Sequence, residues 1–259
     1  MIAVISDLHS NIQALSRALE DIAELGVTRI ACLGDVVGYG ANPRECLQLV
    51  MERCEFTLLG NHEDAMMNFA EDFNDNARAA IHWTQDRLNA PEFPADQNFA
   101  FWNFLGELPH QVETDGALFV HGSPRDPVRE YMLPRDARNP DKMERVFAAQ
   151  TQPVSFVGHS HVPGVYVEGG EKHISPRELE NGIYVVPKDR RVLVNVGSVG
   201  QPRDGDPRLS YVIFEPAAEG RAARIAFRRL AYDHEAASRS IRAEQGLPVY
   251  LAERLLVGR

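Results

Sequence analysis

The sequence begins MIAVISDLH over residues 1–9, an apolar run that ends directly in Asp7 and His9. The run predicts a buried strand, and alternate residues of a strand face the same side, so these two side chains should project together. Residues 11–25 carry apolar side chains at intervals of three and four, which predicts a helix. Open α/β sheets bind ligands at such strand-to-helix corners. We therefore expect this corner to carry the functional site.

Two further strands end in polar residues of the same kind. Residues 28–33 read as a strand followed by Asp35, and residues 55–59 as a strand followed by Asn61 and His62. Alternating strands and helices imply parallel strands with right-handed crossovers. The carboxyl ends of parallel strands lie at one edge of a sheet, so the polar residues should meet there.

The pattern changes between residues 63 and about 110. Strand signals disappear and helical spacing returns, with many aromatic side chains, Phe69 among them. This predicts a helical cap inserted into a single domain that spans residues 1–259. The aromatic side chains either line a substrate cleft or simply pack the cap onto the domain.

Short strands return in the second half of the chain, and three histidines follow two of them: His121, His159 and His161. Residues 165–167 and 183–186 are expected to form a hairpin, and the second half as a whole should be largely antiparallel. The predicted fold is a four-layer α-β-β-α sandwich of two mixed β-sheets flanked by helices.

Composition limits the function classes. The chain has 259 residues, 44% of them hydrophobic and 25% charged, and a formal net charge of −10. This charge argues against a protein that grips the nucleic-acid backbone, which needs a basic face. No secretory signal or membrane-length apolar run of ~18 residues is visible. Cys32, Cys46 and Cys54 lack paired spacing, so we expect a reduced, cytoplasmic protein.

Seven residues are candidate metal ligands: Asp7, His9, Asp35, Asn61, His121, His159 and His161. Oxygen and imidazole donors together suit Mn, Fe or Zn better than Ca or Mg. Seven donors are too many for one tetrahedral ion but suffice for two ions if one carboxylate bridges them. Two ions ~3.5–4 Å apart can clamp the attacking and leaving oxygens of a displacement at phosphorus, and a water between them becomes the nucleophile.

Five motifs occur in a fixed order between residues 7 and 161. They are Asp7-x-His9, Gly34-Asp35, Gly60-Asn61-His62, Val120-His121-Gly122 and Gly158-His159-Ser160-His161. In order and spacing the set resembles the calcineurin-like metallophosphoesterase superfamily. Residues 6–15 look most like its bacterial branch of small phosphoesterases, related to diadenosine tetraphosphatase.

The resemblance implies a dinuclear enzyme. It would hydrolyse a small or nucleotide-like phosphodiester or phosphomonoester by means of a hydroxide that bridges two divalent transition-metal ions, with Mn favoured and Fe, Zn or Ni as alternatives. One ion would be bound by Asp7, His9 and His161, and the other by Asn61, His121 and His159. Asp35 would bridge both ions, and His62 would act as the general acid or hold the phosphate.

The sequence departs from the protein phosphatase branch after Asp35. Gly38 and Tyr39 stand where that branch has an Asp and an Arg, which favours phosphodiesters or small monoesters over phosphoproteins. Arg125 or Arg203 could grip the phosphate instead, although each could equally pair with a neighbouring Asp. Tyr39 could contact a base or a phosphate, or serve ordinary packing.

The alternative function is an inactive scaffold or regulatory protein that kept the fold and lost the chemistry. That outcome usually requires loss of ligands or of the acid histidine, and none is missing here. A nuclease on long DNA is opposed by the acidic charge. The expected partner is a small phosphate-ester or nucleotide substrate, with no membrane and no stable nucleic-acid complex.

Overall fold

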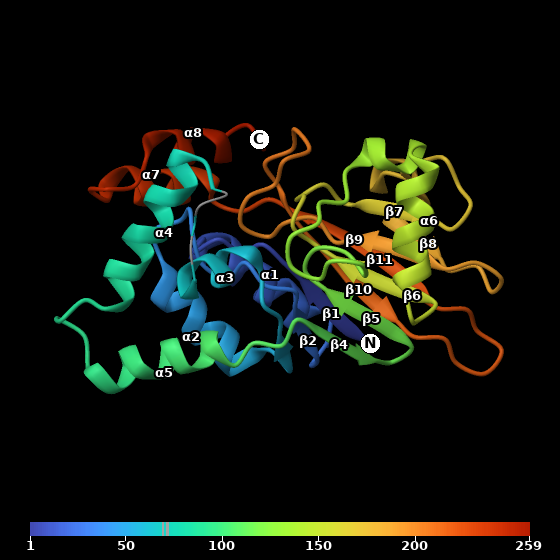
Figure 1. Ribbon diagram of the computed structural model, residues 1–259, viewed down its shortest axis with the longest axis horizontal. Coiled ribbons are helices and arrows are strands. Elements are labelled where there is room, and N and C mark those ends of the chain that lie inside the picture. The colour runs from blue at the N-terminus through green and yellow to red at the C-terminus, as the bar shows by residue number, and fades with distance from the viewer. Residues whose placement is uncertain (69, 71–72) are drawn as a thin grey trace.

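The structure is a computed structural model that describes residues 1–68, 70 and 73–259, so Phe69 lies outside the described residues. Two β-sheets pack face to face, and helices cover their outer faces (Figure 1). The four-layer α-β-β-α sandwich that the sequence predicts is confirmed.

The first sheet contains the three strands that open the chain. Its six described strands have the order β3-β2-β1-β10-β11-β8. Their bounds are β1 (Ile2–Ile5), β2 (Ile30–Cys32), β3 (Phe56–Thr57), β8 (Ile183–Val185), β10 (Leu209–Glu215) and β11 (Arg224–Leu230). Strands β1, β2 and β3 are parallel, as predicted, and β1 pairs antiparallel with β10 on its other side.

The second sheet corrects the expectation that the second half of the chain is largely antiparallel. Its described strands have the order β4-β5-β6-β9-β7, with bounds β4 (Gln111–Thr114), β5 (Ala117–Val120), β6 (Val154–Val157), β7 (Gly164–Val167) and β9 (Val192–Asn195). Strands β5, β6 and β9 are parallel, so the second half of the chain is less antiparallel than predicted. The reason is helix α6 (Pro140–Ala149), which forms a crossover between β5 and β6.

The predicted hairpin of β7 and β8 is wrong, because the two strands lie in different sheets. Strand β7 pairs with β9, and β8 pairs with β11. The connection between them contains two short 3-10 helices, Pro176–Glu178 and Glu180–Gly182. A connection of this length is not a hairpin turn, and it lets the chain change sheets.

The other helices flank the first sheet and the site. They are α1 (Ile12–Glu24), α2 (Pro43–Arg53), α3 (Asn61–Met67), α4 (Asp75–Leu88), α5 (Ala95–Gly106), α7 (His234–Ala243) and α8 (Val249–Leu255), and a further 3-10 helix spans Pro134–Arg138. Helices α3, α4 and α5 occupy the segment for which the sequence predicts a helical cap. In Figure 1 the helices α2, α4, α5, α7 and α8 lie on one side of the molecule and α6 on the other. No described helix has the length and apolar character that crossing a bilayer would require.

An aromatic core joins the two sheets. Phe119 and Phe156 of the second sheet stack with ring centroids 5.2 Å apart, and Phe156 also contacts Phe214 of the first sheet at 5.0 Å. All three rings are buried, and burial of each is worth about 1.5–3 kcal/mol. This core fixes the sheets relative to each other, so the loops beyond their strand ends meet in a defined arrangement.

Candidate metal centre

Six of the seven predicted ligands lie in loops beyond the strand ends, and Asn61 is the first residue of α3. Asp7, His9, Asp35, His159 and His161 all have left-handed backbone conformations, with φ between 46° and 61°. Asp7 and His9 do face the same cluster, as expected. The alternation of a strand is not the cause, because neither residue is extended. Left-handed non-glycine residues cost about 1–2 kcal/mol each and cluster at functional sites.

Close contacts between loops bring the ligands together. A Cβ atom on Gly60 would lie 2.2 Å from Oδ1 of Asp35, and one on Gly158 would lie 2.5 Å from Oδ2 of Asp7. Only glycine leaves room for these carboxylates. The glycine that precedes a ligand in two of the motifs therefore serves the approach of a carboxylate from another loop.

Asp7, His9, Asp35 and His161 form the first cluster of buried donors. Each offers one ligand atom, and these atoms all lie within 4.8 Å of one another. Nε2 of His161 is 3.1 Å from Oδ1 of Asp7 and 3.1 Å from Nε2 of His9. This spacing matches several ligands arranged around one ion.

The second cluster shares Asp35 with the first. Asp35, His121 and His159 each offer an atom within 4.8 Å of the others. Nε2 of His121 lies 3.2 Å from Nδ1 of His159 and 3.1 Å from Oδ1 of Asn61. Oδ2 of Asp35 lies 3.7 Å from Nε2 of His9 and 3.5 Å from Nε2 of His121, so it reaches both clusters. All seven residues predicted as ligands therefore converge.

Hydrogen bonds to the backbone fix the tautomer of each histidine. In every ring the nitrogen that faces away from the cluster lies against a carbonyl oxygen, which can only accept, so that nitrogen carries the proton. The pairs are Nδ1 of His9 with Val37 (3.2 Å), Nδ1 of His121 with Leu33 (3.1 Å), Nδ1 of His161 with Gln201 (2.5 Å) and Nε2 of His159 with Arg129 (3.1 Å). The nitrogens inside the clusters are thus bare lone pairs. Two facing lone pairs 3.1 Å apart repel each other unless a cation lies between them, so the donors fit metal ions.

Burial sets the charge state of these groups. It lowers the pKa of His121 and of His159 to about 3, so both rings are neutral near pH 7. Burial also raises the pKa of Asp35 well above its usual range, and the charges of Glu63 and Asp7 raise it further. A shared carboxylate in this setting is stabilised by adjacent positive charge.

Glu63 holds the loop that carries Asp35. Its Oε2 accepts from the backbone N–H groups of Asp35 (2.7 Å) and Gly60 (3.1 Å), and its Oε1 accepts from that of Val37 (3.1 Å). Burial raises the pKa of Glu63 to about 7 despite these bonds. Glu63 is thus a positioning residue, and its place three residues after Gly60 is the spacing of a capping box.

The ring of His62 is packed among other aromatic rings beside the clusters. Its backbone N–H donates to Oδ1 of Asp35 at 2.9 Å, and its ring packs edge-on against Tyr39, His9 and Phe73 at 4.4, 4.7 and 5.0 Å. Its buried Nδ1 has no hydrogen-bond partner among the described residues. A Cβ on Gly38 would lie 2.1 Å from this atom, so Gly38 leaves room for the ring.

An open hollow of about 250 Å³, here called the inner hollow, lies over the second cluster. Asn61 and His159 line it together with Tyr39, Phe73, Asn74, Ala77, Arg129 and Tyr131. The ring of Tyr131 stacks on His159 at 3.7 Å. Arg129 and Tyr131 belong to no motif of the sequence, and only their position shortly after His121 could have suggested them.

The three predicted substrate contacts have different surroundings. Tyr39 lines the inner hollow, and the guanidinium of Arg203 lies 5.8 Å from the centre of its ring. Arg125 instead pairs with Glu130, with Nε 3.1 Å from Oε2, and it is not among the described residues that line the hollow.

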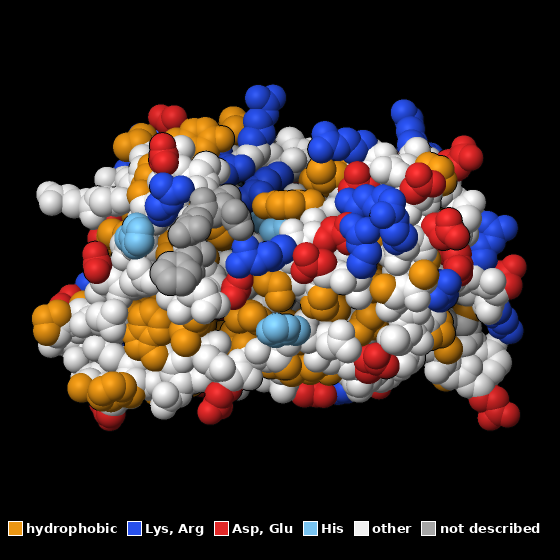
Figure 2. All heavy atoms as spheres, in the orientation of Figure 1, with side chains coloured by type: hydrophobic (Ala, Val, Ile, Leu, Met, Phe, Trp, Pro, Cys, Tyr) orange, Lys and Arg blue, Asp and Glu red, His pale blue; other side chains and the backbone are white. Residues whose placement is uncertain are grey.

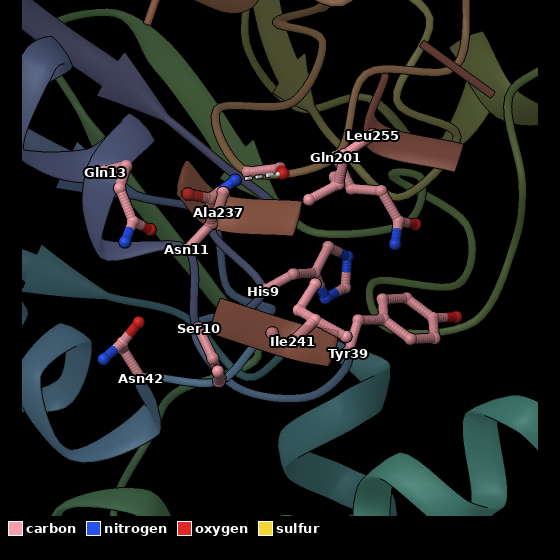
Figure 3. A pocket seen from close by; sticks show the side chains of 13 residues that line it. His9, Ser10, Asn11, Gln13, Tyr39, Asn42, Gln201, Ala237, Ile241 and Leu255 are labelled. Carbon is pink, nitrogen blue, oxygen red and sulfur yellow. Dashed lines mark hydrogen bonds between the residues drawn. The ribbon is translucent and has the colours of Figure 1, made fainter. Parts of the chain in front are cut away.

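A second, much smaller cavity lies behind His9 (Figure 3). Figure 3 shows His9 and Tyr39 side by side at its edge, and the amide of Asn11 donates to the carbonyl of Gly200 at 2.8 Å. Its volume is about 10 Å³, which is the size of a single water molecule. It is therefore too small for a substrate, and the inner hollow is the open approach to the ligands.

Comparisons with known proteins show the family and the fold of this chain. Residues 1–219 match a family described as the calcineurin-like phosphoesterase superfamily domain. The chain is 37% identical to the uncharacterized protein MJ0912 of Methanocaldococcus jannaschii, over 100% of this chain and 98% of that protein. The crystal structure of a metallophosphoesterase from Sphaerobacter thermophilus is 36% identical with a TM-score of 0.81, over 100% and 98% of the two chains. The hypothetical protein PH1004 from Pyrococcus horikoshii OT3 shares the fold, at 20% identity and a TM-score of 0.71, over 100% and 99%.

Proposed function

Since the chain belongs to the calcineurin-like phosphoesterase superfamily, we propose that it is a dinuclear metal-dependent phosphoesterase that hydrolyses small or nucleotide-like phosphodiesters or phosphomonoesters. One observation carries the proposal. Two clusters of buried donors share Asp35, and the tautomers of the four histidines direct unprotonated ring nitrogens into both clusters. Such an arrangement is costly without cations and favourable with them.

The seven converging residues would divide between two ions. Asp7, His9 and His161 would hold the first ion, Asn61, His121 and His159 the second, and Asp35 both. Imidazole and carboxylate donors favour Mn, Fe, Zn or Ni, with Mn proposed first. When bound, such ions neutralise phosphate charge and lower the pKa of water to near neutrality.

Other residues of the chain would serve the phosphate and the leaving group. His62 is proposed to donate a proton to the departing oxygen, a contribution of typically ~10²–10⁴-fold in rate. The guanidinium of Arg203 is proposed to hold phosphate oxygens, because its fork of N–H groups matches their geometry. Tyr39, between Arg203 and His62, would border the substrate.

The shared carboxylate provides the test. We would measure bound metal by mass spectrometry, and turnover of p-nitrophenyl phosphate and bis-p-nitrophenyl phosphate with added Mn²⁺. Asp35→Asn should lose both ions and activity, whereas Asp7→Asn should lose mainly the first ion. Asp141→Asn, which changes an exposed carboxylate at the start of α6, is the matched control and should behave as wild type.

Two results would count against the proposal. Full turnover of Asp35→Asn with both ions bound would exclude the bridging role. A wild-type protein that binds no metal and hydrolyses neither ester would favour the alternative, an inactive scaffold with this fold.

A further inference from the structure

A larger hollow of about 490 Å³, here called the outer hollow, adjoins the inner hollow. The two share Tyr39, Asn74 and Tyr131 in their walls. The outer hollow is completed by Arg203, from the loop before β10, and by Arg254 of α8. A substrate bound at the metal centre can therefore extend past Tyr39 towards these two arginines.

The outer hollow concentrates positive charge. In the part of the chain that the structure describes, no acidic side chain pairs with Arg203 or Arg254, whereas Arg191 and Arg228 each hold a carboxylate. Asp75 also lines the hollow, but its carboxylate lies 3.7 Å from the guanidinium of Arg78. Lysine and arginine side chains gather over the upper middle of the face in Figure 2, although the net charge of the chain is −10.

The two guanidinium groups are near enough to affect each other. Burial lowers the pKa of Arg254, and the charge of Arg203 lowers it further. Partly buried cations that repel each other are unfavourable, and a bound anion relieves both the desolvation and the repulsion.

The positions of both arginines are set before any ligand arrives. Nε and Nη2 of Arg203 donate to Oε1 of Gln201 at 3.3 and 2.8 Å, and Nε of Arg254 donates to the main-chain oxygen of Arg259. The N–H of Gly205 donates to the carbonyl of Gly258 at 2.9 Å, which ties the loop carrying Arg203 to the segment after α8. Groups held in place in this way lose little entropy on binding.

Aromatic rings flank the same arginines. The guanidinium of Arg254 lies 5.4 Å from the ring centre of Tyr250, as that of Arg203 lies 5.8 Å from Tyr39. Contacts with aromatic faces hold a guanidinium in place while leaving its N–H edges available to oxygen acceptors. Tyr131 and Tyr250 are 44% and 52% exposed, so their rings are open to the organic part of a ligand.

We infer that Arg254, next to Arg203 in the outer hollow, provides a second anion site, which takes another phosphoryl group of the substrate. The preferred substrate is then a phosphate ester with a second phosphoryl group some distance from the reacting one. This inference rests on the proposed phosphoesterase function and narrows its substrate class.

Two chromogenic diesters that differ only in a second phosphoryl group provide the test. They are thymidine 5′-(p-nitrophenyl phosphate) and its 3′-phosphorylated form, assayed with the Mn²⁺-loaded full chain. We expect wild type to prefer the 3′-phosphorylated ester about tenfold or more in kcat/KM, mainly through KM, as a charge-assisted contact would provide. Arg254→Gln should lose most of that preference, and Arg254→Lys should keep part of it.

Arg239→Gln is the control, because Arg239 is an exposed arginine of α7 whose guanidinium lies 3.7 Å from Glu235. It should keep the wild-type preference. Thermal melting of each variant separates loss of folding from loss of binding. Equal preference in wild type and Arg254→Gln overturns the second anion site.

A direct binding measurement distinguishes failure of this inference from failure of the proposed function. If neither ester nor p-nitrophenyl phosphate is hydrolysed, the proposed function fails, and calorimetry with thymidine 3′,5′-bisphosphate and thymidine 5′-phosphate still decides the anion site. Tighter binding of the bisphosphate that Arg254→Gln removes supports the site. Equal affinity of the two nucleotides overturns it.

Discussion

Gly158→Ala tests whether close packing of loops positions the candidate ligands. A Cβ atom at this position would lie 2.1 Å from Oγ of Ser6 and 2.5 Å from Oδ2 of Asp7. Real Cβ contacts are essentially never shorter than 3.0 Å, so Oγ of Ser6 must move by about 0.9 Å and Oδ2 of Asp7 by about 0.5 Å. Overpacking of this kind costs about 1–3 kcal/mol of unfolding free energy. Metal ligands tolerate deviations of only about 0.2 Å, so the displacement is large enough to open the Asp7 site.

We therefore expect Gly158→Ala to lose metal from the Asp7 site and to lower kcat by up to roughly 100-fold, the effect of a 1 Å displacement of reacting groups. Metal content, turnover of bis-p-nitrophenyl phosphate and thermal melting would measure this. Gly106→Ala is the control, because its added Cβ would meet only Cε of Met67 at 3.5 Å. A Gly158→Ala protein with wild-type metal content and turnover would refute the reasoning.

Burial alone would raise the pKa of Asp21, but hydrogen bonds from Arg228 and Tyr211 outweigh it and hold the pKa below its usual value. Asp21→Asn should therefore cost about 1–3 kcal/mol of unfolding free energy. The whole of this loss should be seen above about pH 5, and the loss should shrink as the pH falls through the lowered pKa of Asp21. Denaturant titrations that show a pH-independent difference between the two proteins would contradict this. Glu63→Gln should lower Tm and metal content, because an amide offers one acceptor oxygen where the carboxylate offers two; an unchanged melt and metal content would exclude its positioning role. Removing metal with a chelator should lower Tm, and added Mn²⁺ should restore it; a melt insensitive to both would contradict metal binding.

The convergence of the seven candidate ligands is predictable from the sequence because each of them follows a strand or begins a helix within a short motif. Strand ends at one edge of a sheet converge whatever the details of the loops. The backbone conformations of the loops were not predictable in this way. His159 and His161 face the clusters through left-handed backbone, and the reason lies in contacts with loops far away in sequence, such as Gly158 against Asp7.

Residues without motifs were harder to predict. Arg254 lies more than ninety positions after His161, and only the packing of α8 beside the loop of Arg203 gives it a place near the centre. The failed hairpin has a similar cause. Strands β7 and β8 are both short and mostly apolar, and the sheet that each strand joins depends on its partner, β9 or β11, which the local sequence does not specify.

Strand β1 has one further consequence, for the order in which the protein matures. Every candidate ligand precedes residue 162, yet β1 lies between β2 and β10, and β6 lies beside β9. The backbone of Asp7 is also held by Ser198 and Gly200. A nascent chain that has emerged from the ribosome only as far as His161 contains all the donors but not the scaffold that gathers them. Loading with ions must therefore await synthesis of the later strands, and a truncated product ending there would be an unmetallated chain.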